Sequence, residues 1–144
     1  SLMDLLANPT FPLRAEAALR IVKDVAQGMQ FLHGADPPVL HGDLKSANIL
    51  VDCAFVARIS DFGLVSRCNG HFRSLWAAPE YLSGGVATAS TDVWAFGVVV
   101  CEVLSRRPPY HDYAGDDLFE SVRVGAVRPR VRAGCSTEIA ALVS

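Results

Sequence analysis

Residues 41–63, which read HGDLKSANILVDCAFVARISDFG, constrain the fold of this chain most. Two short apolar segments follow one another within this stretch. The segments Asn48–Val51 and Val56–Ser60 are rich in Ile, Val and Leu, which is typical of β-strands. Because only a few residues separate them, the pattern predicts a small β-hairpin.

Polar residues flank the two predicted strands, and a hairpin of this size brings Asp43, Asn48 and Asp61 to one end. Two carboxylates and one amide that converge there form an oxygen-rich site, which is the ligand environment that Mg²⁺ prefers. Such a site suits the binding of metal-bound phosphates beside a carboxylate that accepts a proton. The alternative is turn chemistry, since Asp and Asn are common turn formers.

These residues resemble the large-lobe signature of protein kinases. The pattern H-x-D-x-K-x-x-N at 41–48 is followed by D-F-G at 61–63 and A-P-E at 78–80, in the order and with the separations of that family. The tyrosine-kinase-like group of Ser/Thr kinases is the most similar. The resemblance implies a mainly α-helical (α+β) C-terminal lobe with a small β-hairpin at the active site and the N-terminal lobe absent. Residues 1–144 are then a partial kinase domain, truncated at both ends.

The resemblance also implies roles for the residues of this stretch. Asp43 matches the catalytic base, which accepts the proton of the substrate hydroxyl. Lys45 matches a residue that neutralises charge on the transferred phosphoryl group, and outside this motif it would be a solvated loop charge. Asn48 and Asp61 match the Mg²⁺ ligands that hold ATP. Leu50 matches the residue beneath the adenine ring, although a plain core position explains it equally well.

The function implied is phosphoryl transfer from Mg-ATP to Ser or Thr hydroxyls of a protein substrate, in the full-length parent. The alternatives are a pseudokinase, a kinase-homology regulatory or binding module, and an inactive truncated product. The presence of Asp43, Asn48 and Asp61 favours an enzyme. The Gly-rich loop, the Val-Ala-x-Lys strand and the hinge are absent. We therefore expect an N-terminal lobe in the parent, and expect this chain alone to bind Mg-ATP poorly and to be nearly inactive.

Gly42 departs from the family pattern, because most kinases have an Arg there that pairs with a phosphorylated activation loop. Because Gly42 has no side chain to pair with a phosphate, we expect that any kinase activity does not depend on phosphorylation of the activation loop through this residue. Loss of phosphoryl transfer after Ser66 and Ser74 are replaced with Ala would contradict this expectation. Ser74 is the nearest candidate for the hydroxyl that contacts the catalytic loop. His41 is expected to pack against Phe62 and not to act as a catalytic histidine.

Composition excludes several other classes of protein. The net charge is −2 in 144 residues, which argues against non-specific nucleic-acid binding, and the alternating Arg128, Arg130 and Arg132 are expected in an exposed turn. The longest apolar run, Val93–Val100, is far shorter than the roughly 20 residues that span a bilayer. No signal peptide is apparent at 1–6, so a cytoplasmic location is expected, on the cytosolic side if the parent is a receptor. The four cysteines lack a C-x-x-C motif and are expected to be reduced.

Apolar periodicity predicts five helices. They are Ser1–Leu6, Arg14–His33, Asp92–Ser105, Asp117–Val124 and the beginning of a last helix at Thr137–Val143. Thr91 is the expected N-cap of the third helix. By resemblance, Asp92 accepts hydrogen bonds from the backbone near His41 and Gly42.

The glutamate of the A-P-E motif raises a question of stability. By resemblance Glu80 is buried and pairs with an arginine whose segment lies beyond Ser144. A buried carboxylate without its partner costs about 3–5 kcal/mol. We therefore expect the isolated chain to be poorly stable unless Glu80 faces water.

Overall fold

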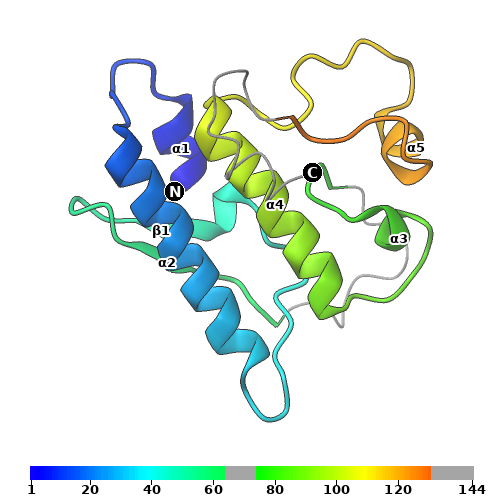
Figure 1. Cartoon of the computed structure of the whole chain (residues 1–144), viewed down its shortest axis with the longest axis horizontal. Coiled ribbons are helices and arrows are strands. Elements are labelled where there is room, and N and C mark those ends of the chain that lie inside the picture. The colour runs from blue at the N-terminus through cyan, green and yellow to red at the C-terminus, as the bar shows by residue number, and fades with distance from the viewer. Residues whose placement is uncertain (64–73, 131–144) are drawn as a thin grey trace.

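The computed structural model describes residues 1–63 and 74–130, and Figure 1 shows their arrangement. This part of the chain is mainly helical with one two-stranded antiparallel sheet, which confirms the predicted fold class. The elements in chain order are α1 (Leu2–Ala7), α2 (Ala15–His33), the 3₁₀ turn η1 (Ser46–Asn48), β1 (Ile49–Val51), β2 (Ala57–Ile59), α3 (Pro79–Leu82), α4 (Ala89–Ser105) and α5 (Leu118–Arg123).

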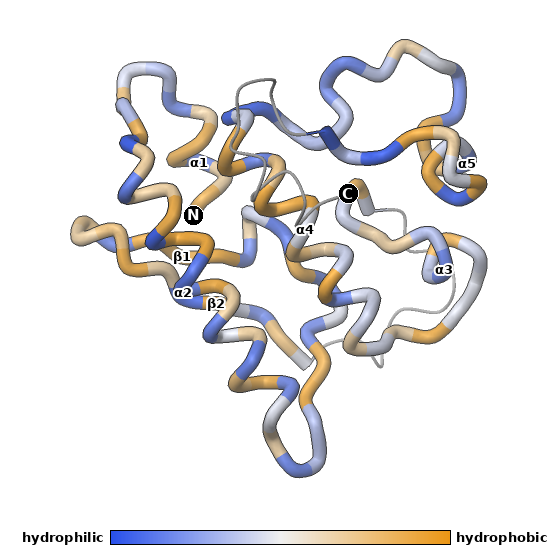
Figure 2. Tube along the Cα trace, viewed as in Figure 1, coloured by the Kyte–Doolittle hydropathy of each residue, from blue (hydrophilic) through white to orange (hydrophobic). Residues whose placement is uncertain are grey.

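Helices α2 and α4 form the centre of the fold, and the β-hairpin packs against α2. Apolar residues at helical spacing place one face of α2 in the core, and charged residues occupy the opposite face. Figure 2 shows this alternation of hydrophobic and hydrophilic positions along α2. The buried residues of α2 are Ala18, Ile21, Val25, Met29 and Leu32.

The hairpin is short and lies very close to α2. Its register pairs Ile49 with Ile59, and Asp24 of α2 accepts a hydrogen bond from the Ala57 backbone N–H at 3.0 Å. At Gly28 of α2, a Cβ atom would lie only 2.7 Å from the Cδ1 of Ile59. Glycine at this position therefore allows the hairpin to approach the helix closely.

Helix α4 begins at Ala89, one turn before the predicted start. Thr88 is the N-cap, and its hydroxyl accepts a hydrogen bond from the Thr91 backbone N–H at 3.3 Å. Thr91 in turn bonds the backbone N–H of Thr88, so it closes a capping box as the third helical residue. The prediction of Thr91 as N-cap was wrong because Ser, Thr and Asp follow one another here and offer several capping positions.

Helices α1 and α5 begin at polar caps near the predicted positions, whereas Arg14 at the start of α2 makes no side-chain capping bond. Ser1 closes a capping box with Asp4 at α1, and Asp117 accepts the Glu120 backbone N–H at α5. The short helix α3 was not predicted, although proline in its first turn favours a helix start. The helix predicted at Thr137–Val143 lies outside the described residues.

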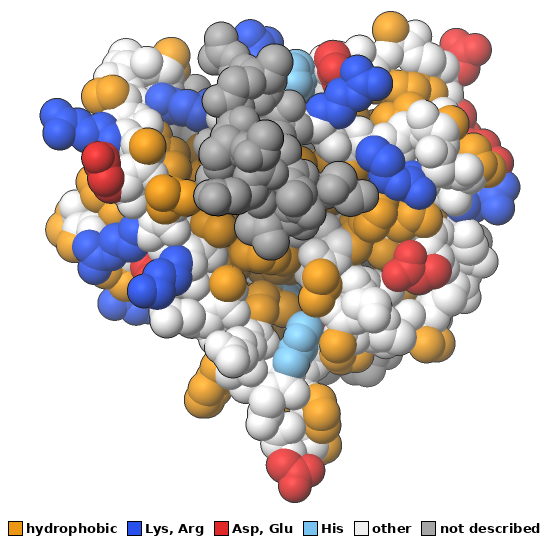
Figure 3. Space-filling view, in the orientation of Figure 1, with side chains coloured by type: hydrophobic (Ala, Val, Ile, Leu, Met, Phe, Trp, Pro, Cys, Tyr) orange, Lys and Arg blue, Asp and Glu red, His pale blue; other side chains and the backbone are white. Residues whose placement is uncertain are grey.

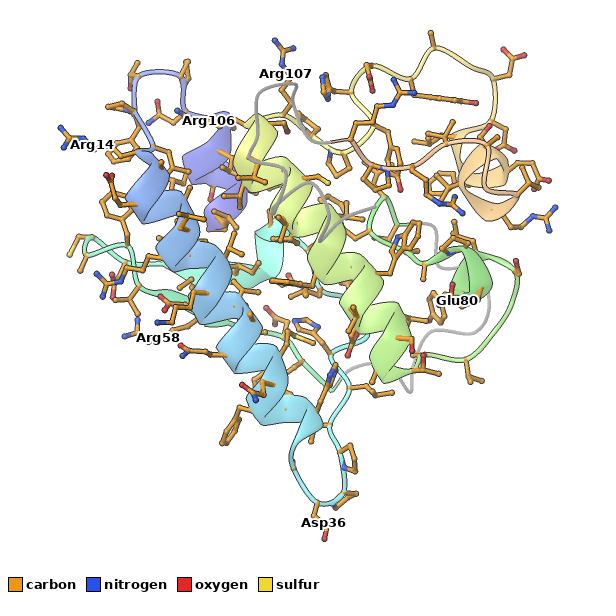
Figure 4. All side chains as sticks on the ribbon, in the orientation of Figure 1. Arg14, Asp36, Arg58, Glu80, Arg106 and Arg107 are labelled. Atoms are coloured by element: carbon orange, nitrogen blue, oxygen red, sulfur yellow. The ribbon has the colours of Figure 1, made fainter. Side chains whose placement is uncertain are left out.

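Arg106 joins α1 to the end of α4 (Figure 4). It is the C-cap of α4 in the left-handed region, at φ 53°. Its guanidinium donates hydrogen bonds to the carbonyl oxygens of Phe11 at 2.6 Å and Asn8 at 2.7 Å. These bonds satisfy carbonyl groups after α1 and fix that segment on α4.

Glu80 is exposed, in α3 (Figure 4). The prediction of a buried Glu80 was wrong, because α3 lies on the surface with none of its residues buried and this side chain faces water. The expected cost of an unpaired buried carboxylate at this position therefore does not apply.

The surface shows several further features of the described residues. Lys and Arg side chains lie at several separate places on the face shown in Figure 3. No helix in ranges 1–63 and 74–130 is both long enough and apolar enough to cross a bilayer. Cys53 is exposed and Cys101 is buried, and neither forms a disulfide with a described residue.

Candidate active site

The loop that carries the H-x-D-x-K-x-x-N pattern is fixed to the N-terminal part of α4. The buried carboxylate of Asp92 accepts the backbone N–H groups of His41 and Gly42, each at 2.8 Å. This pair of hydrogen bonds confirms the role predicted for Asp92. The ring of His33, at the end of α2, donates a third hydrogen bond to Asp92 at 2.9 Å. One carboxylate therefore ties the loop to both central helices.

His41 is completely buried, and burial lowers the pKa of its imidazole. Its Nδ1 lies 3.4 Å from the backbone N–H nitrogen of Asp43, which it accepts as a weak hydrogen bond. A neutral buried ring that accepts from the backbone has a packing role, as expected. Phe62 is 48 % exposed, and its contact with His41 stays a prediction.

Asp43, Lys45 and Asn48 come together within the loop. The Nζ of Lys45 lies 2.6 Å from Oδ2 of Asp43. The side-chain amide of Asn48 donates to the backbone carbonyl of Asp43 at 2.9 Å and lies 3.4 Å from Oδ2. The other carboxylate oxygen of Asp43, Oδ1, is buried and has no hydrogen-bond partner among the described residues. Asp43 thus has one buried acceptor atom that no described residue engages.

Asp61 is brought to the same end of the hairpin by Ser60. The backbone N–H of Ser60 donates to the Asn48 carbonyl at 2.9 Å, and the Ser60 hydroxyl lies 2.9 Å from Oδ2 of Asp61. Asp61 has a positive φ of 58°, and Gly63 bonds back to the Leu40 carbonyl at 3.2 Å. This turn leaves the Asp61 carboxylate exposed beside the loop.

The chemistry of these side chains fits a hard divalent cation. The amide nitrogen of Asn48 is engaged with Asp43, so its carbonyl oxygen is the atom left for a metal. Asp61 adds an exposed carboxylate, and Mg²⁺ prefers such oxygen ligands together with phosphate oxygens and water. Among residues 1–63 and 74–130, no three His, Cys, Asp or Glu side chains gather into a metal site of their own.

A small, open pocket lies next to Asp43. It lies between the loop, the segment 74–78 and α4, and most of its wall is formed by small or aromatic side chains. The lining residues are Gly42, Asp43, Leu44, Ser74, Trp76, Ala77, Ala78, Tyr81, Ala87, Thr91, Asp92 and Ala95.

Glu102 is a buried polar residue that sequence reasoning missed. It is 5 % exposed, and it accepts the Ser46 hydroxyl at 3.0 Å and the Trp76 indole N–H at 2.6 Å. Burial raises its pKa to about 7, and the two hydrogen bonds oppose that shift. A carboxylate within the apolar later part of this helix, between Val98 and Leu104, was the signal that could have identified it.

Two other predicted residues behave differently in the structure. Leu50 is 53 % exposed, so the explanation of this residue as plain core is wrong, while its place beneath an adenine ring stays a prediction. The Ser74 hydroxyl accepts the backbone N–H of Trp76 at 3.3 Å. The predicted contact of Ser74 with the catalytic loop stays a prediction, and Ser66 lies outside the described residues.

The class of protein follows from this combination of a helical lobe, a small hairpin and a polar loop at the hairpin's end. The family model for protein tyrosine and serine/threonine kinases matches residues 1–144. The chain therefore belongs to the protein tyrosine and serine/threonine kinase family. Membership implies ATP as co-substrate, typically with Mg²⁺, and protein substrates.

Several curated kinases are similar to this chain. A probable serine/threonine-protein kinase, drkC of Dictyostelium discoideum, is 34 % identical over 154 residues, which cover 100 % of this chain and 21 % of drkC. The L-type lectin-domain containing receptor kinase S.1 of Arabidopsis thaliana is 37 % identical, with 90 % of this chain and 23 % of that protein covered. The serine/threonine-protein kinase-like protein CCR4 of Arabidopsis thaliana is 40 % identical, with 78 % and 17 % covered. The chain thus spans less than a quarter of the length of these relatives.

Proposed function

We propose that this chain carries the catalytic loop and metal-binding residues of a protein Ser/Thr kinase, as a partial kinase domain whose N-terminal lobe belongs to the parent. The observation that carries the proposal is the cluster in which Lys45 and Asn48 both bond Asp43, with Asp61 at the same end of the hairpin. The presence of Lys45 favours Ser/Thr over Tyr substrates, and the names of the relatives agree with this choice.

The residues divide the chemistry between them. Asp43 orients the substrate hydroxyl and accepts its proton as the hydroxyl oxygen attacks the γ-phosphorus. Lys45 holds one carboxylate oxygen of Asp43 and places a positive charge beside the transferred group. Asn48 and Asp61 would hold Mg²⁺, which supplies charge neutralisation at the phosphates. Leu50, exposed on β1, would contact the adenine ring.

The experiment is transfer of labelled γ-phosphate from Mg-ATP to a generic Ser/Thr protein substrate. It uses the longest native chain that contains these residues, with Asp43→Asn and Asp61→Asn as variants. We expect Asp43→Asn to lower kcat by about 10²–10⁴, which is typical for loss of a positioned base. We expect Asp61→Asn to abolish transfer and to weaken Mg-ATP binding.

The matched control is Asp36→Asn, which changes an exposed carboxylate in the turn after α2 (Figure 4). It should leave transfer at the parental rate. Parental rates in Asp43→Asn would remove Asp43 from the role of base. A folded parent without any transfer would overturn the enzyme function and leave a regulatory, kinase-homologous module as the explanation.

A further inference from the structure

Glu102 is a buried carboxylate for which the proposed transfer reaction has no direct use. Its two oxygens contact two segments that are far apart in the sequence. Oε1 accepts the hydroxyl of Ser46 at 3.0 Å, and Oε2 accepts the indole N–H of Trp76 at 2.6 Å. The carboxylate thus links α4 to the catalytic loop on one side and to the segment 74–78 on the other.

Each of the two partners lies beside a part of the candidate site. Ser46 begins the turn η1, between Asp43 and Asn48 in the sequence. Trp76 lines the open pocket together with Asp43. The relative position of the base and the pocket wall therefore depends on hydrogen bonds to one side chain.

No cation neutralises Glu102 among the residues that the structure describes. The charged groups on the neighbouring loop, Asp43 and Lys45, are paired with each other at 2.6 Å. On the segment that follows Trp76, Glu80 is exposed, and on α4 itself the adjacent titratable group is the buried thiol of Cys101. Among the described residues, the polar contacts of the Glu102 carboxylate are the hydrogen bonds from Ser46 and Trp76. Burial raises the pKa of Glu102 to about 7.

On the basis of the proposed function, we propose that Glu102 is a positioning residue for phosphoryl transfer, which in its ionised form holds the catalytic loop against the substrate-binding wall at Trp76. The ionised carboxylate accepts both hydrogen bonds at once, and such charge-assisted bonds are stronger than neutral ones. A neutral carboxyl group must donate with one oxygen, so that Ser46 has to accept where it previously donated. The loop and the wall are then held less firmly.

The test measures kcat and KM between pH 6 and 8.5 for the longest native chain and for Glu102→Gln. Gln reproduces the shape and the hydrogen-bonding capacity of the neutral carboxyl group. We expect the kcat of the parent to rise with an apparent pKa near 7. In the variant we expect kcat about tenfold lower above pH 8, without that rise, because small displacements of a base are costly. The KM for ATP should be unchanged. Glu16→Gln, on the exposed first turn of α2, is the matched control and should keep the parental profile.

Trp76→Phe provides a second route if Glu102→Gln does not fold. It removes the indole N–H and keeps an aromatic ring. Because that hydrogen bond lowers the pKa of Glu102, we expect the rise in kcat to move to higher pH. Parental profiles in the folded variants, with an active parent, would overturn the positioning role alone. A parent that transfers no phosphate would instead overturn the proposed function on which this role rests.

Discussion

The two ends of α4 both bury a carboxylate, but they satisfy it differently. Asp92, in the first turn, receives two backbone N–H groups and the ring of His33. Glu102, near the last turn, receives one hydroxyl and one indole N–H, and burial raises its pKa to about 7. The difference shows that one carboxylate anchors the backbone of a loop, whereas the other links two side chains from distant segments.

The largest effect is expected at the Asp92 end. Asp92→Ala leaves two backbone N–H groups and His33 without their acceptor inside the protein. Orphaned buried donors of this kind should lower the free energy of unfolding by about 3–5 kcal/mol. Chemical denaturation of the longest native chain measures this loss. A loss below about 1 kcal/mol would contradict this prediction, because it would mean that the bonds of Asp92 contribute little to the stability of the fold.

The next effect concerns the pH dependence of stability at the Glu102 end. The pKa of Glu102 is raised in the folded state from 4.5 to about 7, so the folded protein keeps a proton that the unfolded chain has lost between these values. The contribution of the protonated Glu102 to the free energy of unfolding is therefore fully present below pH 4.5. It is lost as the pH rises through 7. It amounts to about 3 kcal/mol.

Glu102→Gln should remove this dependence, because an amide does not titrate. Relative to the parent, the variant should therefore gain stability as pH rises from 4.5 to 7. Denaturation curves of both proteins at several pH values provide the measurement, and the difference between them isolates this group. Curves that stay parallel over the range would show that Glu102 titrates near its ordinary pKa.

The smallest effect is expected at Gly42, whose backbone N–H bonds Asp92. Gly42 has a φ of +77°, which is unfavourable for residues with a Cβ. Gly42→Ala should cost about 1 kcal/mol, and Gly42→Asn less, since Asn tolerates this region better. Thermal unfolding of the pair measures both values. Equal stability of parent and Ala variant would indicate that the loop adjusts without strain.

Much of the fold was predictable because its elements depend on local patterns. The apolar face of α2 and the Ile- and Val-rich strands predict the central helix and the hairpin within two residues. The cluster of Asp43 with Lys45 and Asn48 was predictable in part, because these residues lie within one short loop.

The rest could not be read from the sequence because it depends on contacts between distant segments. The bond from His33 to Asp92 spans 59 positions, and that from Ser46 to Glu102 spans 56. The start of α4 was misplaced because several adjacent residues are suitable caps. The exposure of Glu80 follows from how α3 sits on the rest of the chain, and no local pattern signals it.

The contact between Gly28 and Ile59 has a consequence for motion. Because β2 packs closely against α2 around Gly28 and Ile59, the strands and that helix should move as one body. Asn48 and Asp61 flank this hairpin, whereas the start of the loop before Asp43 is bonded to α4. Because Asn48 also bonds Asp43 directly, a displacement of α2 relative to α4 would be transmitted into the loop that holds the proposed base.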